Sequence, residues 1–380
     1  MLFISKVKEM AKYLIRWAFK DQMHGLDRFH SSQIDTKKLN DLLSLIDKNS
    51  HPNINDLWWV IKDIDPIRLN IKNFGYHLGR TLTPILTSTD APENPVVVNV
   101  VSKPTTQEDI ESPWFKYWCK QLKTAPLYHR KLWEFAFLLQ AIQDRGLFNR
   151  KELKGIGFGC GQEPLAAYFA SKDISIVVTD LEPEKTSGMG WTNTGQHTSS
   201  LDMAYYADIV ERDKFNNYVK HKFADMNDIP EDIGSNFDFC WSVCAMEHLG
   251  SIKKGLEFVE NSLKVLKPGG IAIHTTEYNY LSESITIDDW PTVLFLSKHF
   301  EELATSLATK GHRMLGPNFD IGNGVLDRFI DLPPYAFGEG GWFKLDNNQW
   351  DEINQVVHLK LAIDGFPCTC FGIIVIKADE

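Results

Sequence analysis

The chain has 380 residues, and its 40 Lys and Arg against 50 Asp and Glu give a net charge of −10 at pH 7. This acidic balance, without a dense basic block, argues against a protein that follows a phosphate backbone, so we expect no nucleic acid partner. The six cysteines form no C-x-x-C pair and no zinc spacing, which is typical of a reducing compartment. No apolar run approaches the roughly 20 residues of a membrane span, and lysines interrupt the N-terminus where a signal peptide would be apolar. We therefore expect a cytoplasmic protein without a membrane span.

The first 105 residues predict a mainly helical extension before an α/β domain at 106–380. Residues 2–20 place apolar side chains on one helical face and lysines and arginines largely elsewhere. We expect this helix to pack against the body or a second subunit, with peripheral contact to a membrane surface as the alternative. The valine-rich stretch 96–102 predicts a strand. Residues 129–148 predict a helix whose first turn, with His129 and Arg130, either approaches a ligand or is an ordinary basic first turn.

A glycine-rich turn follows that helix. Gly157, Gly159 and Gly161 alternate where a buried strand would turn into a helix, so the backbone can approach a ligand that any Cβ would block. Asp180 follows the next predicted strand, 174–179, and stands nineteen residues after Gly161. That is about the spacing at which a carboxylate meets the ribose hydroxyls of a bound nucleotide.

The residues of this turn limit the classes of ligand that it could bind. A dinucleotide fingerprint would need glycine at 162 or 164, where this chain has Gln162 and Pro164. Instead, Glu163 stands near the helix start and leaves less room for a pyrophosphate. Two acidic groups around the turn suit a cationic, phosphate-free ligand, and S-adenosylmethionine has both a sulfonium and an ammonium group.

Further strands and helices follow in an alternating order. A strand at 218–223 precedes Asp225 and Met226, and a buried strand at 237–243 runs into Cys244. We then predict a helix at 252–266, a strand at 271–276 leading to Glu277 and Asn279, a helix at 303–312, and a last strand at 369–377.

These motifs resemble those of the class I S-adenosylmethionine-dependent methyltransferases, in the same order and at similar spacing. The set G-F-G-x-G-x-E-P-L, G-W-x-x-T-G-Q-H, M-E-H-L-G-S and H-T-T-E-Y-N is most similar to bacterial members encoded with polysaccharide and glycan biosynthesis genes. The resemblance implies a Rossmann-like seven-stranded, mostly parallel sheet with helices on both faces and an antiparallel last strand. It also implies S-adenosylmethionine as cofactor and S-adenosylhomocysteine as product.

The resemblance carries cofactor-binding roles over to this chain. Asp225 would accept from the adenine amine and Met226 would cover the ring. Gly157 stands where the family usually has an acid, so Glu163 is the carboxylate expected at the methionine amine. The full set of expected cofactor residues is Gly157, Gly159, Gly161, Glu163, Asp180, Asp225, Met226 and Cys244.

A long insertion at 186–200, rich in Gly, Ser and Thr, follows the Asp180 strand. Trp191, Gln196 and His197 are unusual in a disordered loop, so we expect a lid or substrate loop, the alternative being a surface insertion with one packed Trp. The residues expected to bind substrate are Trp191, Gln196, Asn279, His129 and Arg130.

Methyl transfer to a hydroxyl needs a base that takes the hydroxyl proton. His248 is the first candidate and Glu277 the second, with Glu247 and His197 as further candidates. A divalent metal on Glu247 and His248 is a disfavoured alternative, because Cys244 stands where related metal-binding members have a first carboxylate. His274, in mid-strand, is expected to be a packed core histidine.

The sequence therefore predicts an S-adenosylmethionine-dependent methyltransferase that acts on a sugar hydroxyl in a glycan, a lipid-linked precursor or a nucleotide sugar. The alternatives are methylation of another small molecule, such as a natural-product hydroxyl or amine, and a non-catalytic partner of the same fold in a polysaccharide-assembly complex.

Overall fold

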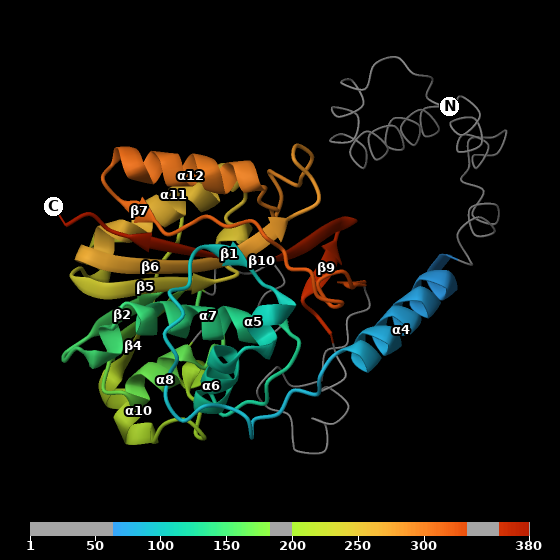
Figure 1. Ribbon diagram of the computed structural model, residues 1–380. Coiled ribbons are helices and arrows are strands. Elements are labelled where there is room, and N and C mark those ends of the chain that lie inside the picture. The colour runs from blue at the N-terminus through green and yellow to red at the C-terminus, as the bar shows by residue number, and fades with distance from the viewer. Residues whose placement is uncertain (1–63, 183–199, 333–356, 380) are drawn as a thin grey trace, which may run out of the picture. The chain divides into compact units, whose positions relative to one another are not determined.

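The computed structural model describes residues 64–182, 200–332 and 357–379 (Figure 1). The helix expected at 2–20 and the loop residues Trp191, Gln196 and His197 lie outside these ranges. The chain divides into two compact units, residues 1–77 and 78–380, and helix α4 (Ile64–Leu82) runs through the division. The domain boundary expected at residue 105 stays a prediction.

The second unit alternates strands and helices along most of its length. Its strands are β1 (Lys103–Pro104), β2 (Lys154–Gly157), β3 (Ser175–Asp180), β4 (Val219–Phe223), β5 (Phe237–Val243), β6 (Leu266–Asn279), β7 (Arg313–Met314), β8 (Ile330–Asp331), β9 (Lys360–Ile363) and β10 (Phe366–Ile376). Its helices are α5 (Gln107–Glu111), α6 (Pro113–Gln121), α7 (Arg130–Asp144), α8 (Leu165–Ser171), α10 (Arg212–Tyr218), α11 (Ile252–Ser262) and α12 (Ser297–Thr309).

All ten strands belong to one mixed sheet with the order β4-β3-β2-β5-β6-β10-β9-β8, and β1 and β7 pair with β10. The strands from β4 to β6 are parallel neighbours, whereas β10 is antiparallel to β6, which confirms the expected antiparallel last strand. The expectation of seven strands was wrong. Six of the ten strands were predicted from the sequence. The other four are β1, β7 and β8, of two residues each, and β9, of four residues, and such short pairings carry no readable periodicity.

The strand order reverses between β2 and β5. The first strand of the parallel set, β2, lies between the second (β3) and the fourth (β5), which is the Rossmann-like arrangement. In such sheets ligands bind outside the carboxyl ends of the strands at this switch point. The glycine turn after β2 and Cys244 after β5 both lie there.

Helices cover both faces of the sheet, with α11 and α12 on one side and α5, α6, α7, α8 and α10 on the other (Figure 1). Helix α7 packs on β5, β6 and β10 and is buried around nearly its whole circumference. Gly372 on β10 makes this close approach feasible, because a Cβ there would lie 2.2 Å from the ring of Phe137. On the opposite face, Phe300 of α12 stacks on Phe371 of β10 with ring centroids 4.1 Å apart.

The prediction of a strand at 96–102 was wrong, because the backbone of this segment forms hydrogen bonds with side chains of α7. The backbone N–H groups of Val98 and Val100 donate to the carboxylate of Asp144 at 2.9 and 2.8 Å. Gln140 donates to the carbonyl of Val96 at 2.8 Å. These bonds satisfy the backbone groups that a sheet neighbour would otherwise need to pair.

The strand expected at 237–243 is confirmed with its bounds. Apart from 96–102, the other helices and strands expected within the described residues are confirmed with shifted ends. Helix α12 begins at Ser297 rather than at residue 303. Helix α7 begins where His129 caps it, since His129 Nδ1 accepts from the N–H of Lys131 at 3.0 Å. Within the described ranges, no helix is both long and apolar enough to cross a membrane.

Gly372→Ala tests the packing of α7 on the sheet. The added methyl group must displace Phe137, so we expect the free energy of unfolding to fall by about 1–3 kcal/mol in urea titrations. The control is Gly365→Ala, where nothing lies within 4 Å of the new Cβ and only a φ of +86° opposes it. Equal losses in the two variants would contradict the packing argument.

Candidate active site

The glycine turn after β2 packs tightly against the ends of neighbouring strands. Gly159 and Gly161 have φ of +57° and +51°, the left-handed region that side chains rarely adopt. A Cβ on Gly159 would lie 2.8 Å from Cβ of Ala245 and 3.2 Å from Sδ of Met226. The turn therefore lies directly beside Met226, one of the residues expected to contact the adenine.

Gly157 has no room for the acid that the family usually places there. A Cβ on Gly157 would lie 2.3 Å from Cys160 Sγ and 2.4 Å from the ring of Trp241. The Trp241 indole N–H donates to Glu163 Oε2 at 3.1 Å, and Glu163 is only 8% exposed. Burial raises the pKa of Glu163 well above its ordinary value, and the negative charges of Glu134 and Asp180 add to this effect.

Asp180 lies at the carboxyl end of β3, where the backbone orients it. Its Oδ2 accepts from the N–H of Gly161 at 3.3 Å and its Oδ1 from the N–H of Leu181 at 2.8 Å, and it is buried. Asp225, after β4, is half-buried, and its Oδ1 accepts from the N–H of Asn227 at 2.8 Å. The expected cofactor residues thus lie at the carboxyl ends of four neighbouring strands, β2 to β5.

The chemistry of this set fits S-adenosylmethionine. Two buried carboxyl groups, Glu163 and Asp180, lie close enough for their charges to oppose each other. A ligand that brings an ammonium group to one and hydroxyl groups to the other would relieve this repulsion. The left-handed glycines beside these carboxyl groups let the backbone approach such a ligand.

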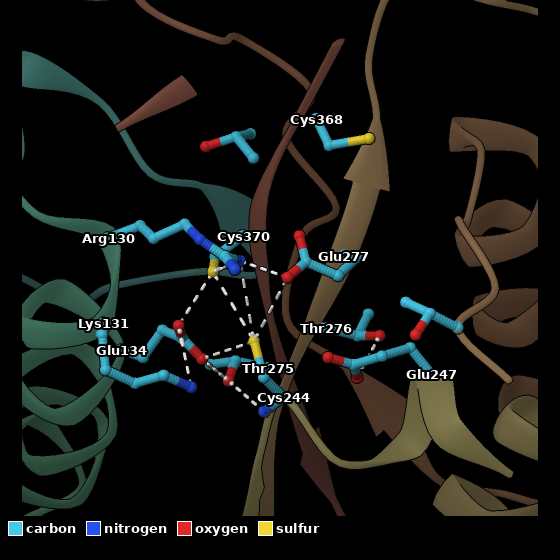
Figure 2. A network of polar contacts seen from close by, with 12 residues as sticks. Arg130, Lys131, Glu134, Cys244, Glu247, Thr275, Thr276, Glu277, Cys368 and Cys370 are labelled. Atoms are coloured by element: carbon cyan, nitrogen blue, oxygen red, sulfur yellow. Dashed lines mark hydrogen bonds and ion pairs between the residues drawn. The ribbon is translucent and has the colours of Figure 1, made fainter. Parts of the chain in front are cut away.

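A second polar group joins α7 to the sheet and is called the α7 network here (Figure 2). Its members are Arg130, Lys131, Glu134, Cys244, Thr275, Glu277 and Cys370. Arg130 and Glu134 lie one helical turn apart and face β6 and β10. Cys370 is the register partner of Glu277, so the strands place those two side chains on the same face.

Glu134 is the fully buried anion of the α7 network. The thiols of Cys244 and Cys370 each donate to it at 2.9 Å, and Lys131 Nζ lies 3.5 Å from its Oε1. Burial opposes the charge of Glu134, but Lys131, Arg130 and the two thiols outweigh it and hold its pKa below the ordinary value. Glu134 therefore stays charged inside the fold.

Arg130 and Glu277 form the other ion pair of the α7 network. Arg130 Nη1 donates to Glu277 Oε1 and lies 3.0 Å from Cys370 Sγ. The second oxygen, Glu277 Oε2, is buried and accepts no hydrogen bond from the described residues, and the same is true of Asn279 Oδ1. Buried acceptors without a donor are rare, so we expect a bound water molecule or a ligand to donate to these two atoms.

The carboxyl and thiol groups here also have metal-like spacing. Glu134, Cys244 and Cys370 form one such group, and Cys244, Glu247 and Glu277 form another. In the described structure, however, Arg130 and Lys131 already pair with the two carboxylates Glu277 and Glu134. We therefore base no step of the reaction on a metal ion.

His248 and Glu247, expected as base or metal ligands, are bonded to different neighbours. His248 Nδ1 lies 2.9 Å from the carbonyl oxygen of Pro291, which can only accept, so Nδ1 carries a proton and donates it there. Glu247 Oε2 accepts from the hydroxyl of Thr276 at 3.0 Å, and burial raises the pKa of Glu247. His248 is half-buried, whereas Glu247 is buried.

A third group lies beside Arg130, and the sequence predicted only His129 of its three members. His358 Nδ1 is 2.7 Å from Asp331 Oδ2, and the rings of His358 and His129 stack with centroids 4.8 Å apart. All three residues are buried. Glu134 and Trp241 were also missed, although the Arg130 to Glu134 spacing along α7 was a signal for one of them.

His274 is a core histidine, as expected. Its Nδ1 lies 2.8 Å from Ser242 Oγ and its Nε2 3.1 Å from Ser262 Oγ, and it is fully buried. Burial lowers the pKa of His274 from 6.5 to about 3. The ring stays neutral in the fold and takes no part in the site.

No protein-family model and no curated protein matches the chain. Among solved structures, it is similar to a candidate sarcosine dimethylglycine methyltransferase from Galdieria sulphuraria, with a TM-score of 0.39 and 14% identity over 73% of this chain and 92% of that one. An S-adenosylmethionine-dependent methyltransferase from Clostridium acetobutylicum gives 0.34 and 11% over 62% and 89%. An O-methyltransferase family protein from Burkholderia thailandensis gives 0.32 and 11% over 66% and 59%. None of the three reaches a TM-score of 0.5. We therefore base the assignment of a function on the strand order and side chains of this chain and not on these similarities.

The pH dependence of stability tests the assignment of His274. Unfolding lets this ring take up a proton below its ordinary pKa of 6.5, while the folded ring stays neutral until about pH 3, so stability falls as the pH falls through this window. Between pH 7 and pH 5 we expect His274 to account for a loss of about 2 kcal/mol. His274→Gln should lose less stability over this range in urea titrations than His221→Gln on the edge strand β4. Parallel losses in the two variants would contradict the assignment.

Proposed function

We propose that the chain is an S-adenosylmethionine-dependent methyltransferase. The observation that carries this proposal is a pair of buried carboxyl groups beside the left-handed glycine turn at the switch point of the sheet. Glu163 follows the turn in the chain, and Asp180 accepts from the N–H of Gly161. A pyrophosphate would be repelled there, whereas a nucleoside with a cationic tail would be attracted.

The residues around the turn would share the binding. Asp180 would accept from the ribose hydroxyls and Glu163 from the methionine ammonium, with Trp241 holding the Glu163 carboxyl in place. Asp225 and Met226 would contact the adenine. S-adenosylmethionine, when bound, supplies a methyl group activated by its sulfonium.

We further propose that the acceptor is a sugar hydroxyl in a glycan or a glycan precursor, in the cytoplasm. Glu277 Oε2 and Asn279 Oδ1 support this, because both are buried acceptors without a described donor. They stand two residues apart on one face of β6, which separates their Cα atoms by about 6.6 Å. Neighbouring hydroxyl groups of a sugar ring would satisfy both at once. The motifs shared with glycan-associated methyltransferases favour the same acceptor.

An amine or a natural-product hydroxyl is the second candidate acceptor, because an ammonium group would also donate to Glu277 and Asn279. The acceptor experiment described below distinguishes the two. A non-catalytic partner would have no need of both an intact cofactor turn and two unpaired acceptors.

Asp180→Ala tests the cofactor. Removing the carboxylate leaves the ribose hydroxyls without their acceptor, so calorimetry should show at least a tenfold loss of S-adenosylhomocysteine affinity. Asp213→Ala, an exposed position on α10, is the control and should bind as the wild type does. Unchanged affinity in Asp180→Ala would refute the proposed binding site.

Methyl-labelled S-adenosylmethionine tests the acceptor against a panel of methyl hexosides, nucleotide hexoses and amino sugars. We expect label on hydroxyl oxygen. Asn279→Ala should lower kcat/KM about 10–100-fold, because the bound hydroxyl loses a buried acceptor, while S-adenosylhomocysteine affinity stays unchanged.

Asn261→Ala on α11 is the matched control and should react as the wild type does. Label on nitrogen alone would move the function to amine methylation. Label on no compound, from wild-type protein that binds S-adenosylhomocysteine, would contradict sugar methylation.

A further inference from the structure

The short strands β9 and β8 extend the sheet beyond the start of β10, at the level where β10 pairs with the carboxyl end of β6. Asn279 of β6 is in register with Cys368 of β10, Cys368 with Leu361 of β9, and Leu361 with Asp331 of β8. Residues in register across neighbouring strands project to the same face of a sheet. The Asp331 side chain is thereby placed on the face of the sheet that carries Asn279 and Glu277.

Backbone hydrogen bonds fix His358 against the start of α7. The N–H of Arg130 donates to the carbonyl of His358 at 3.0 Å, and the N–H of His358 donates to the carbonyl of Tyr128 at 2.8 Å. These bonds form an isolated parallel β-bridge between His129 and His358, which stacks their rings with an interplanar angle of 27°. The ring is thus held by the main chain, by stacking and by Asp331.

We propose that His358, oriented by Asp331, is the general base that takes the proton from the acceptor hydroxyl, and this rests on the proposed methyltransferase function. Nδ1 donates to Asp331, which leaves the lone pair on Nε2. The acceptor O–H bond breaks, and the proton binds to Nε2. The electron pair left on the oxygen forms the new bond to the methyl group, while the methyl–sulfur bond of the sulfonium would break with its electron pair left on sulfur, giving S-adenosylhomocysteine. The resulting imidazolium is stabilised by the adjacent Asp331 carboxylate.

The charges around His358 suit this role. The groups that face it are Asp331 from β8, Arg130 and His129 from α7, and Glu277 from β6. Burial lowers the pKa of His358, and Arg130 lowers it further, whereas Asp331 and Glu277 raise it. At pH 7 the ring is therefore neutral and ready to accept a proton.

The two bases expected from the sequence are less well placed. His248 donates its Nδ1 proton to a backbone carbonyl, Pro291 O, whereas His358 donates its Nδ1 proton to a carboxylate that would stabilise the cation directly. Glu277 is ion-paired with Arg130, and protonating it would leave the positive charge of Arg130 unbalanced in the α7 network. His358 has neither disadvantage.

Nitrogen-15 spectra of the histidine rings test the proposal without any acceptor. The signal of His358, identified by its absence from His358→Gln, should show a neutral ring with the proton on Nδ1 and a pKa below 6.5. Asp331→Asn should shift the tautomer balance towards Nε2–H. A charged ring at pH 7, or a proton on Nε2 in the wild type, would overturn the proposal.

Kinetics with the labelled acceptor panel give the second test. A base acts when deprotonated, so the turnover of the wild type should rise with pH through a limb that lies below pH 6.5. His358→Gln should lower kcat about 10²–10⁴-fold and remove this limb, with unchanged S-adenosylhomocysteine affinity. His312→Gln, after α12, is the matched control and should retain both.

The outcomes separate this proposal from the proposed function. A His358→Gln variant that binds S-adenosylhomocysteine and keeps more than a tenth of the turnover would overturn the role of His358 alone. If His358→Gln loses cofactor affinity as well, the pH profile of Asp331→Asn becomes the test. An unchanged rise of turnover with pH in that variant would also overturn the role of His358. Wild-type protein that does not bind S-adenosylhomocysteine would overturn the function itself.

Discussion

The ion pair between Arg130 and Glu277 is the contact on which the rest of the site depends. Both groups lie between α7 and the sheet, where an unpaired charge would be strongly destabilising, so the first turn of the helix must meet β6 at this place. With Arg130 fixed, Glu134 falls one turn further along the same face and reaches the two thiols, while His129 meets His358. The same pair leaves one buried oxygen of Glu277 without a hydrogen bond from the described residues.

The parts of the molecule that could be predicted from sequence are those whose signal is local. The strand 237–243 is mostly apolar, with Asp238 and Ser242 as its polar residues, because β5 is buried on both faces, and its bounds were predicted correctly. His274 follows from its position in mid-strand. The glycine turn could be located because Gly159 and Gly161 adopt conformations that few other residues tolerate.

The parts that could not be predicted depend on residues far apart in the chain. Arg130 and Glu277 meet only because α7 packs across β6, and Asp331 and His358 come together only after β8 and β9 have paired. The segment 96–102 has the β-branched composition of a strand, yet Asp144 and Gln140 satisfy its backbone instead. Composition records propensity, whereas these contacts depend on tertiary geometry that no local pattern encodes.

The close packing of side chains against Gly157 also has an evolutionary consequence. Trp241 fills the volume that an acidic side chain at 157 would occupy, and the same indole holds the carboxyl of Glu163. A descendant could move the acid back to position 157 only if residue 241 became smaller, and Glu163 would then lose its donor. Positions 157, 163 and 241 should therefore change together among homologues or not at all, although 78 residues separate Glu163 from Trp241.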